Sequence, residues 1–274
     1  MQTRVQRFSL LLPVIVLVGV LAWGVASIVG LSLQDRAALL AGFFQRADYV
    51  DALLRTHALS IAATLLCIAL GYPLACYIHQ YQGNRNRLIV LVITPWLVSI
   101  VVRSFGWVVV LGPRGLLNSL LIAVGATDAP LRMMFNSTGI VVGLVHLFLP
   151  FMVLSVLAVL SQIDRAMGEA AASLGAGRLA AFMRVTLPLS MPGILSGAML
   201  VYLSCMGSVV TPLLLGGLSE KMLGTQIYVE MFTAFDFPKS SSMAVLLVAS
   251  SLAVVVPLLW YERRVSRRQS IAKV

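Results

Sequence analysis

Charged residues are scarce in this sequence. Only 11% of its 274 residues are Asp, Glu, Lys or Arg, whereas 59% are hydrophobic. Because soluble globular domains carry about 25% charged residues, this composition excludes an ordinary water-soluble domain. The mean hydropathy of +0.96 points the same way. The sequence therefore predicts an integral membrane protein whose main solvent is the lipid bilayer.

Acidic residues are few, and none of the ten Asp and Glu residues lies in the core of a long apolar segment. Ion-coupled secondary transporters normally place paired acids or broken helices at the membrane midplane, so this class of protein is disfavoured. An intramembrane enzyme is disfavoured too, because His146 has no evident nucleophile at its depth. The distribution of acids therefore argues against both classes.

Cysteine is nearly absent as well. Cys67, Cys76 and Cys205 lie in or beside apolar runs, their number is odd, and their spacing fits no metal site. The three histidines share no ligand spacing either. The sequence therefore predicts neither a disulfide framework nor a bound metal.

The net charge is +10, yet the basic residues form no extended patch. Their one cluster is the C-terminal tail, and on a membrane protein such a tail more often fixes the cytoplasmic side than binds nucleic acid. No nucleic-acid partner is expected. The cluster comprises Arg263, Arg264, Arg267, Arg268 and Lys273.

Six segments are apolar over the roughly 20 residues that a helix needs to cross a bilayer. Helices are expected because lipid cannot satisfy unpaired backbone groups, and the short alternating segments of a membrane β-barrel are missing. The predicted fold class is an all-α integral membrane protein with six transmembrane helices. The segments are Phe8–Leu33, Leu59–Ile78, Leu88–Leu111, Thr138–Leu160, Leu195–Leu215 and Ser241–Tyr261.

The loops between these segments predict the orientation. With both termini in the cytoplasm, the inner loops and ends hold twelve Lys and Arg residues and the outer loops hold seven, as the positive-inside rule requires. The outer loops are long enough for short interfacial helices. The last of them carries Glu220, Glu230 and Asp236, for which an exposed, solvated position is the simplest interpretation.

The inner loop 161–194 is strongly patterned. Asp164–Leu174 is rich in helix formers, Gly175 and Gly177 then predict a bend, and Arg178–Thr186 predicts a second helical stretch. Small side chains in the first stretch would allow another protein to approach closely. We expect a short helix that lies along the membrane surface and binds a partner.

This loop resembles a motif of bacterial ABC importer permeases. The motif reads E-A-A, three residues, G, nine residues, I, one residue, L-P. The chain matches every spacing, with a single departure, Val in place of Ile, which removes one methylene. The matching residues are Glu169, Ala170, Ala171, Gly175, Val185, Leu187 and Pro188.

The resemblance extends over most of the chain. Residues 70–78, 94–107, 131–152 and 189–197 look like the permease group that imports spermidine and putrescine. The resemblance implies a single transmembrane permease domain over residues 1–274, with the type I ABC importer permease fold. Its coupling helix would be Asp164–Leu174, in the loop between the fourth and fifth spans.

The resemblance also implies partners. Two ATP-binding cassette subunits would bind ATP and Mg, a second and different permease chain would complete the pathway, and a periplasmic binding protein would deliver the solute. The chain has no G-x-x-x-x-G-K-[ST] motif, so we expect no cofactor of its own and no enzyme activity. It would lie in the bacterial inner membrane and import a polyamine; another small organic solute, amino-acid-like or phosphonate, is the alternative.

Candidates for the solute pathway are polar and aromatic residues within the spans, together with one methionine. Arg103 would line the pathway or hold a helix junction, because intramembrane charges are usually functional; the alternative is an arginine that snorkels to the interface. Aromatic faces attract ammonium groups, although ordinary packing explains each of them singly. The candidates are Trp96, Arg103, Trp107, His146, Tyr202 and Met206.

Overall fold

The computed structural model describes residues 42–164, 175–217 and 219–271, together with residues 16, 18–20, 22–24, 26–28, 30, 167 and 173. Every regular element in this part of the chain is a helix. Five helical stretches within it are long and apolar enough to cross a membrane. The first predicted span, Phe8–Leu33, falls largely outside the described residues.

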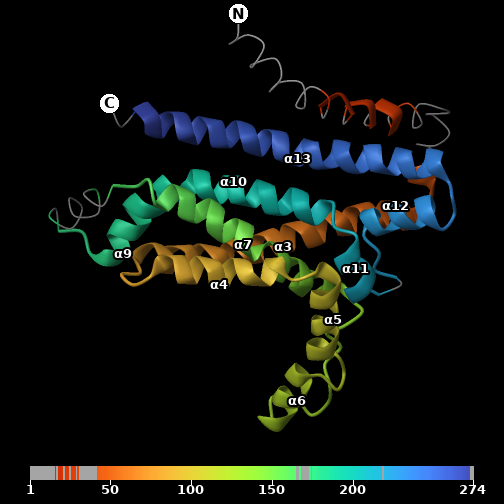
Figure 1. The fold of residues 1–274 in the computed structure, drawn as a ribbon, viewed down its shortest axis with the longest axis horizontal. Coiled ribbons are helices and arrows are strands. Elements are labelled where there is room, and N and C mark those ends of the chain that lie inside the picture. The colour runs from red at the N-terminus through yellow and green to blue at the C-terminus, as the bar shows by residue number, and fades with distance from the viewer. Residues whose placement is uncertain are drawn as a thin grey trace, which may run out of the picture.

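The core is a bundle of three long helices, α3 (Ala47–Gln80), α7 (Ser137–Leu160) and α10 (Leu187–Met206), which lie side by side (Figure 1). Small residues allow the close approach. A Cβ added to Gly197 would lie 2.9 Å from the sulfur of Met152 on α7, so only glycine fits there without a shift. Most core side chains are aliphatic or small, as expected for helices that pack within lipid.

Helix α13 (Phe237–Ile271) covers the outer side of α10 (Figure 1). Met199, Tyr202 and Met206 of α10 pack there against Val255. At one end of the bundle, the short helix α12 (Leu223–Phe232) joins α13 to α3. The expected short helix in the last outer loop is therefore present.

The third span is not the continuous helix that the sequence predicts for Leu88–Leu111. Helix α4 (Arg85–Leu97) stops, and α5 (Ile100–Leu111) starts in a new direction. In a continuous helix, the carbonyl of Pro95 would accept a bond from the N–H four residues later. Here the Arg103 guanidinium donates to that carbonyl at 2.8 Å, so the interruption leaves it satisfied.

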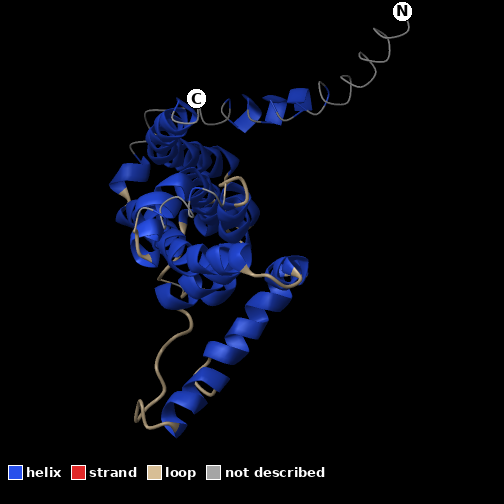
Figure 2. Cartoon of the chain, turned by 90° about the vertical axis from the view of Figure 1, so that its left-hand side faces the viewer, coloured by secondary structure: helices blue, strands red, loops and turns tan. Residues whose placement is uncertain are grey.

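Helices α5 and α6 (Leu116–Ala123) form an arm that leaves the bundle, as Figures 1 and 2 both show. Asn118, near the start of α6, is fully buried. Its amide donates to the carbonyls of Gly112 and Leu131 at 2.9 and 3.1 Å, and its oxygen accepts from the Leu131 N–H at 2.8 Å. The asparagine therefore ties the junction of α5 and α6 to the loop that follows α6.

The predicted limits of the other spans also need correction. The fifth span begins at Leu187 and ends at Met206, and α11 (Val210–Leu215) is a separate short helix after an interruption at Gly207. The predicted stretch Leu195–Leu215 crossed that interruption because the segment is apolar throughout. Helices α3 and α13 extend well beyond their predicted spans. The prediction was too short because hydropathy detects only the length of helix that lies in the hydrocarbon core.

Candidate functional site

One end of the bundle, called here the loop end, carries the patterned loop. It consists of residues 79–85, 161–164 and 175–190, which connect α3 to α4 and α7 to α10. Glu169, Ala170 and Ala171 lie outside the described residues, as does most of the predicted coupling helix Asp164–Leu174. The rest of the motif can be placed.

Gly175 directly follows the predicted coupling helix. Its φ of +83° lies in the left-handed region, which a residue with a Cβ reaches only at a cost. No atom would lie within 4 Å of an added Cβ, so the backbone conformation alone requires glycine. This explains the glycine of the motif in physical terms.

The chain after Gly177 is helical, as predicted for Arg178–Thr186. Helix α9 (Arg178–Ala181) leads into the π-helical turn η1 (Phe182–Thr186), which continues without interruption into α10. Pro188 accounts for the π turn, since a proline ring clashes with the carbonyl four residues before it in a regular helix and the wider turn gives it room. The Leu-Pro pair of the motif therefore shapes the junction.

Tyr72 of α3 fixes this junction to the bundle. Its hydroxyl donates to the Ser190 hydroxyl at 2.9 Å, because that hydroxyl in turn donates to the Leu187 carbonyl. Its ring lies 5.9 Å from the ring of Phe182 in η1. A displacement of η1 would therefore act directly on α3 and α10.

Two hollows flank the start of the loop, and Ile163 and Asp164 line both. Arg85 braces this region by donating to the Ser161 hydroxyl at 2.6 Å. The first hollow, of about 300 Å³, is lined by His79, Gln80, Gln82, Leu160, Ile163, Asp164, Val185 and Thr186. The second, of about 510 Å³, is lined by Val159, Gln162, Ile163, Asp164, Met167, Leu189 and Pro192. Val185 of the motif thus faces a concave surface.

The predicted pathway residues fall into two groups. Trp107 donates through Nε1 to His146 Nδ1 at 3.0 Å. Because indole is only a donor, His146 accepts here and is the neutral Nε2–H tautomer. Arg103 bridges α4 and α5 through its bond to the Pro95 carbonyl. Half-exposed Trp96 lies edge-on against Phe151.

The second group lies elsewhere. Tyr202 and Met206 are 5% and 2% exposed, and both are buried against α13. The Tyr202 hydroxyl is 2.7 Å from His57 Nδ1, which links α10 to α3. His57 is therefore a packing partner of Tyr202. In this structure the two residues pack in the interior, and contact with a solute stays a prediction.

The opposite end of the bundle holds a charged cluster that sequence reasoning missed. Glu230 is 7% exposed, so the expectation of a solvated loop position was wrong. Lys239 Nζ lies 2.9 Å from its carboxylate, and the Tyr49 hydroxyl donates to it at 2.9 Å. Arg46 donates to the Tyr49 hydroxyl at 2.7 Å. The sequence signal that could have indicated a bonded Glu230 is its spacing from Gln226, four residues earlier on the same helix.

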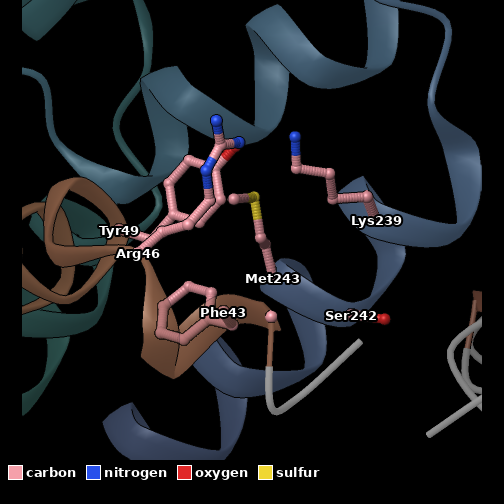
Figure 3. Close-up of a pocket in the computed structure, with 7 residues that line it drawn as sticks. Phe43, Arg46, Tyr49, Lys239, Ser242 and Met243 are labelled. Atoms are coloured by element: carbon pink, nitrogen blue, oxygen red, sulfur yellow. The ribbon is translucent and has the colours of Figure 1, made fainter. Parts of the chain in front are cut away.

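Figure 3 shows how Arg46 and Lys239 approach Tyr49 beside a hollow of about 160 Å³. Their charged groups lie 5.0 and 5.1 Å from the Tyr49 ring centroid. Burial alone would raise the pKa of Glu230, but the bonds from Lys239 and Tyr49 outweigh burial and hold this pKa below its ordinary value. The cluster joins α3, α12 and α13.

The chain is similar to several known permeases. It is 34% identical over 200 residues to the spermidine/putrescine transport system permease protein PotB of Escherichia coli (strain K12), which covers 73% of each chain. It is 35% identical over 210 residues to PotB of Haemophilus influenzae, covering 76% of this chain and 73% of the relative. The inner membrane ABC transporter permease protein YdcU of Escherichia coli (strain K12) is 28% identical, over 79% and 74% of the two chains.

Solved structures share the fold. A chain of a bacterial alginate ABC transporter superposes with a TM-score of 0.79 at 20% identity and covers 96% of both chains. A chain of the MetNI methionine ABC transporter gives 0.59 at 17% identity, over 80% of this chain and 94% of that one. Residues 68–271 match the family of binding-protein-dependent transport system inner membrane components. The chain therefore belongs to this family and is a multi-pass permease subunit of an ABC importer in the inner membrane.

Proposed function

We propose that this permease subunit imports a polyamine such as spermidine or putrescine from the periplasm to the cytoplasm. The observation that carries this proposal is the identity of 34–35% over about three quarters of the chain to permeases named for those two solutes. Another small organic solute, amino-acid-like or phosphonate, is the second candidate. An ion-coupled carrier is now disfavoured by the family itself.

ATP is hydrolysed on two separate cassette subunits, each of which binds one permease at its loop end. The chain itself holds no nucleotide. Support comes from the hollows beside Ile163 and from the unbroken path of α9, η1 and α10. A docked loop that moves with the ATPase would pull on α10 and, through Tyr72, on α3. Free energy enters because the ATP-bound cassettes bind one arrangement of the bundle better than the other.

A second permease chain of different sequence completes the pathway. The arm formed by α5 and α6 supports the presence of a second chain, because it leaves the bundle (Figure 2) and exposes large apolar side chains such as Val102, Phe105 and Val109. That the second chain differs in sequence is what the resemblance to spermidine/putrescine permeases implies. Helix packing against another protein would cover them. Both termini lie in the cytoplasm, so the loop end faces inward and the Glu230 cluster faces the periplasm and the solute-binding protein. The excess of basic residues in the inner loops supports this orientation.

The test is uptake by a reconstituted complex. The permease, its partner permease and the ATPase subunits are placed in liposomes with ATP inside, and the binding protein is added outside with labelled spermidine, putrescine, a basic amino acid or a phosphonate. We expect ATP-dependent accumulation of the polyamines, which the other two solutes do not inhibit. Accumulation of an amino acid or a phosphonate instead would refute the polyamine assignment, and uptake without ATP under an ion gradient would refute the mechanism.

A matched pair of glycine variants tests the coupling role of the loop. Gly175 and Gly177 are both open to an added Cβ, but only Gly175 has a positive φ. Gly175→Ala strains the backbone by about 1–2 kcal/mol, whereas Gly177→Ala adds the same methyl group without strain. We expect loss of binding-protein-stimulated ATPase activity and of uptake in the first variant alone. Equal activity of the two variants would contradict the role of this loop geometry.

A further inference from the structure

Helix α13 continues past its apolar part as a basic helix, named here the basic extension and defined as residues 260–268. It carries Arg263, Arg264, Arg267 and Arg268, against a single acid, Glu262. At 3.6 residues per turn, these four arginine positions fall within an arc of about 140°. The four positions therefore share one side of the helix.

Arg263 and Arg264 of this extension form no ion pair with an acidic residue in the described part of the chain. Among the residues that the structure describes, the ion pair between Glu230 and Lys239 is the only one. Glu262 instead accepts a hydrogen bond from the Ser266 hydroxyl at 3.2 Å. Arg263 and Arg264 are both exposed. Unneutralised arginines at this density favour an anionic ligand.

The extension also begins at the depth of lipid headgroups. Tryptophan marks the membrane interface, and Trp260 closes the apolar part of α13. The Arg264 guanidinium stacks on its ring, with Cζ 3.4 Å from the centroid. With a rise of 1.5 Å per residue, positions 263 to 268 lie about 4 to 12 Å beyond Trp260, and the headgroup layer is about 5–8 Å thick. The arginines therefore start within that layer.

We propose that the basic extension binds the phosphate headgroups of anionic phospholipids in the leaflet that faces the cytoplasm. This inference rests on the proposed orientation of the C-terminus. Guanidinium groups bind phosphate oxygens in pairs, and each basic residue at a membrane surface contributes about a fivefold preference for an anionic surface. A signal that only sets topology would need the charge but would not select a lipid.

The experiment uses the complete complex in nanodiscs, with Trp260 as the only tryptophan of this chain (W23F/W96F/W107F) and a partner permease and ATPase without tryptophan. Energy transfer from Trp260 to dansyl-phosphatidylglycerol is compared with transfer to dansyl-phosphatidylcholine in a phosphatidylcholine bilayer. We expect transfer to the anionic probe to be at least about fivefold stronger and to weaken in high salt. The variant R263Q/R264Q/R267Q/R268Q should reduce the ratio to about one, whereas the matched four-lysine variant should keep most of it.

Further readings separate the alternatives. A ratio near one in the parent, or the same ratio in the four-glutamine variant, would overturn the proposal. So would a four-glutamine variant that keeps the lipid ratio but loses its ATPase subunits, since the extension would then bind protein. Mass spectrometry of phosphatidylglycerol co-purified with the tryptophan-intact complex gives a second measurement, and less bound lipid in the four-glutamine variant is expected.

The orientation is tested separately. A cysteine appended after Val274 should react with a membrane-impermeant maleimide only after the cells are opened. Reaction in intact spheroplasts would place the C-terminus outside and refute the assignment to the cytoplasmic leaflet, while the transfer ratio would still report lipid selection. Failure of the orientation and failure of lipid binding are therefore distinguishable.

Discussion

The buried carboxylate of Glu230 leads to a quantitative prediction about the end of the bundle that carries α12. Replacing Glu230 by Leu leaves the Lys239 ammonium unpaired and removes the acceptor of the Tyr49 hydroxyl. Removal of one partner of a fully buried ion pair costs about 3–5 kcal/mol. The side chain of Lys239 is 25% exposed, so part of its charge reaches water and we expect about 2–3 kcal/mol.

The assay is thermal unfolding of the purified permease complex in detergent, followed by far-ultraviolet circular dichroism. For a chain of this size, a loss of that magnitude lowers the midpoint by about 5–10 °C. Lys239→Met should lower it by a similar amount. The double variant Glu230→Leu/Lys239→Met removes both charges at once, so it should be about 1–2 kcal/mol more stable than the sum of the single effects.

Additive effects of the two substitutions would refute the reasoning, because they would show that the pair contributes nothing beyond its separate side chains. Glu220→Leu is the matched control. Glu220 also accepts a hydrogen bond, from the Ser137 hydroxyl at 2.6 Å, but has no ion pair among the described residues. We expect it to lower the midpoint by less than half as much.

Two further predictions concern acidity and the arm. The pKa of Glu230 is held below its ordinary value, so its stabilising effect is complete above about pH 4.3 and is lost as the pH falls through the lower folded value. The gap in unfolding midpoint between the parent and Glu230→Leu should stay constant from neutral pH to about pH 5 and shrink only in stronger acid; a gap that closes near neutral pH would contradict this. Asn118→Ala removes three hydrogen bonds at a fully buried position, which should cost about 2–3 kcal/mol locally and speed amide hydrogen exchange across residues 112–131 by about 30-fold or more. The exposed Asn86→Ala serves as its control, and unchanged exchange in the Asn118 variant would show that the arm is held by other contacts.

The sequence could predict those helices whose ends carry polar signals. Helix α7 begins at Ser137, just after Asn136 accepts a bond from the Gly139 N–H, and ends at Leu160, just before Ser161, so both ends fall within one residue of the predicted limits. The stretch across α4 and α5 could not be divided in this way. Both helices are predominantly apolar, and the donor that compensates the interruption, Arg103, lies eight residues from Pro95. Hydropathy cannot detect such a contact.

The two candidate sites differ in the same respect. The motif at the loop end is local, so Gly175, Val185, Leu187 and Pro188 could be recognised from the resemblance of one short segment to the permease motif. The Glu230 cluster is assembled from distant parts of the chain, since Tyr49 and Glu230 are 181 residues apart. Its members carry no motif, and each resembles an ordinary loop residue until the fold brings them together.

The π turn at Phe182–Thr186 has a consequence for the interchange of loops between related permeases. A π turn holds one residue more than the α-helical turn that it replaces, and each residue of a helix adds about 100° of rotation. The turn therefore sets the angular phase between whatever docks on the loop and the face of α10 that contacts α7. A chimaera joined within η1 to a permease without this π turn would alter that phase by a whole residue, whereas one joined at Gly175 or Gly177, before α9, would preserve it. This phase, as much as the sequence of the loop, should decide which ATPase can drive a hybrid permease.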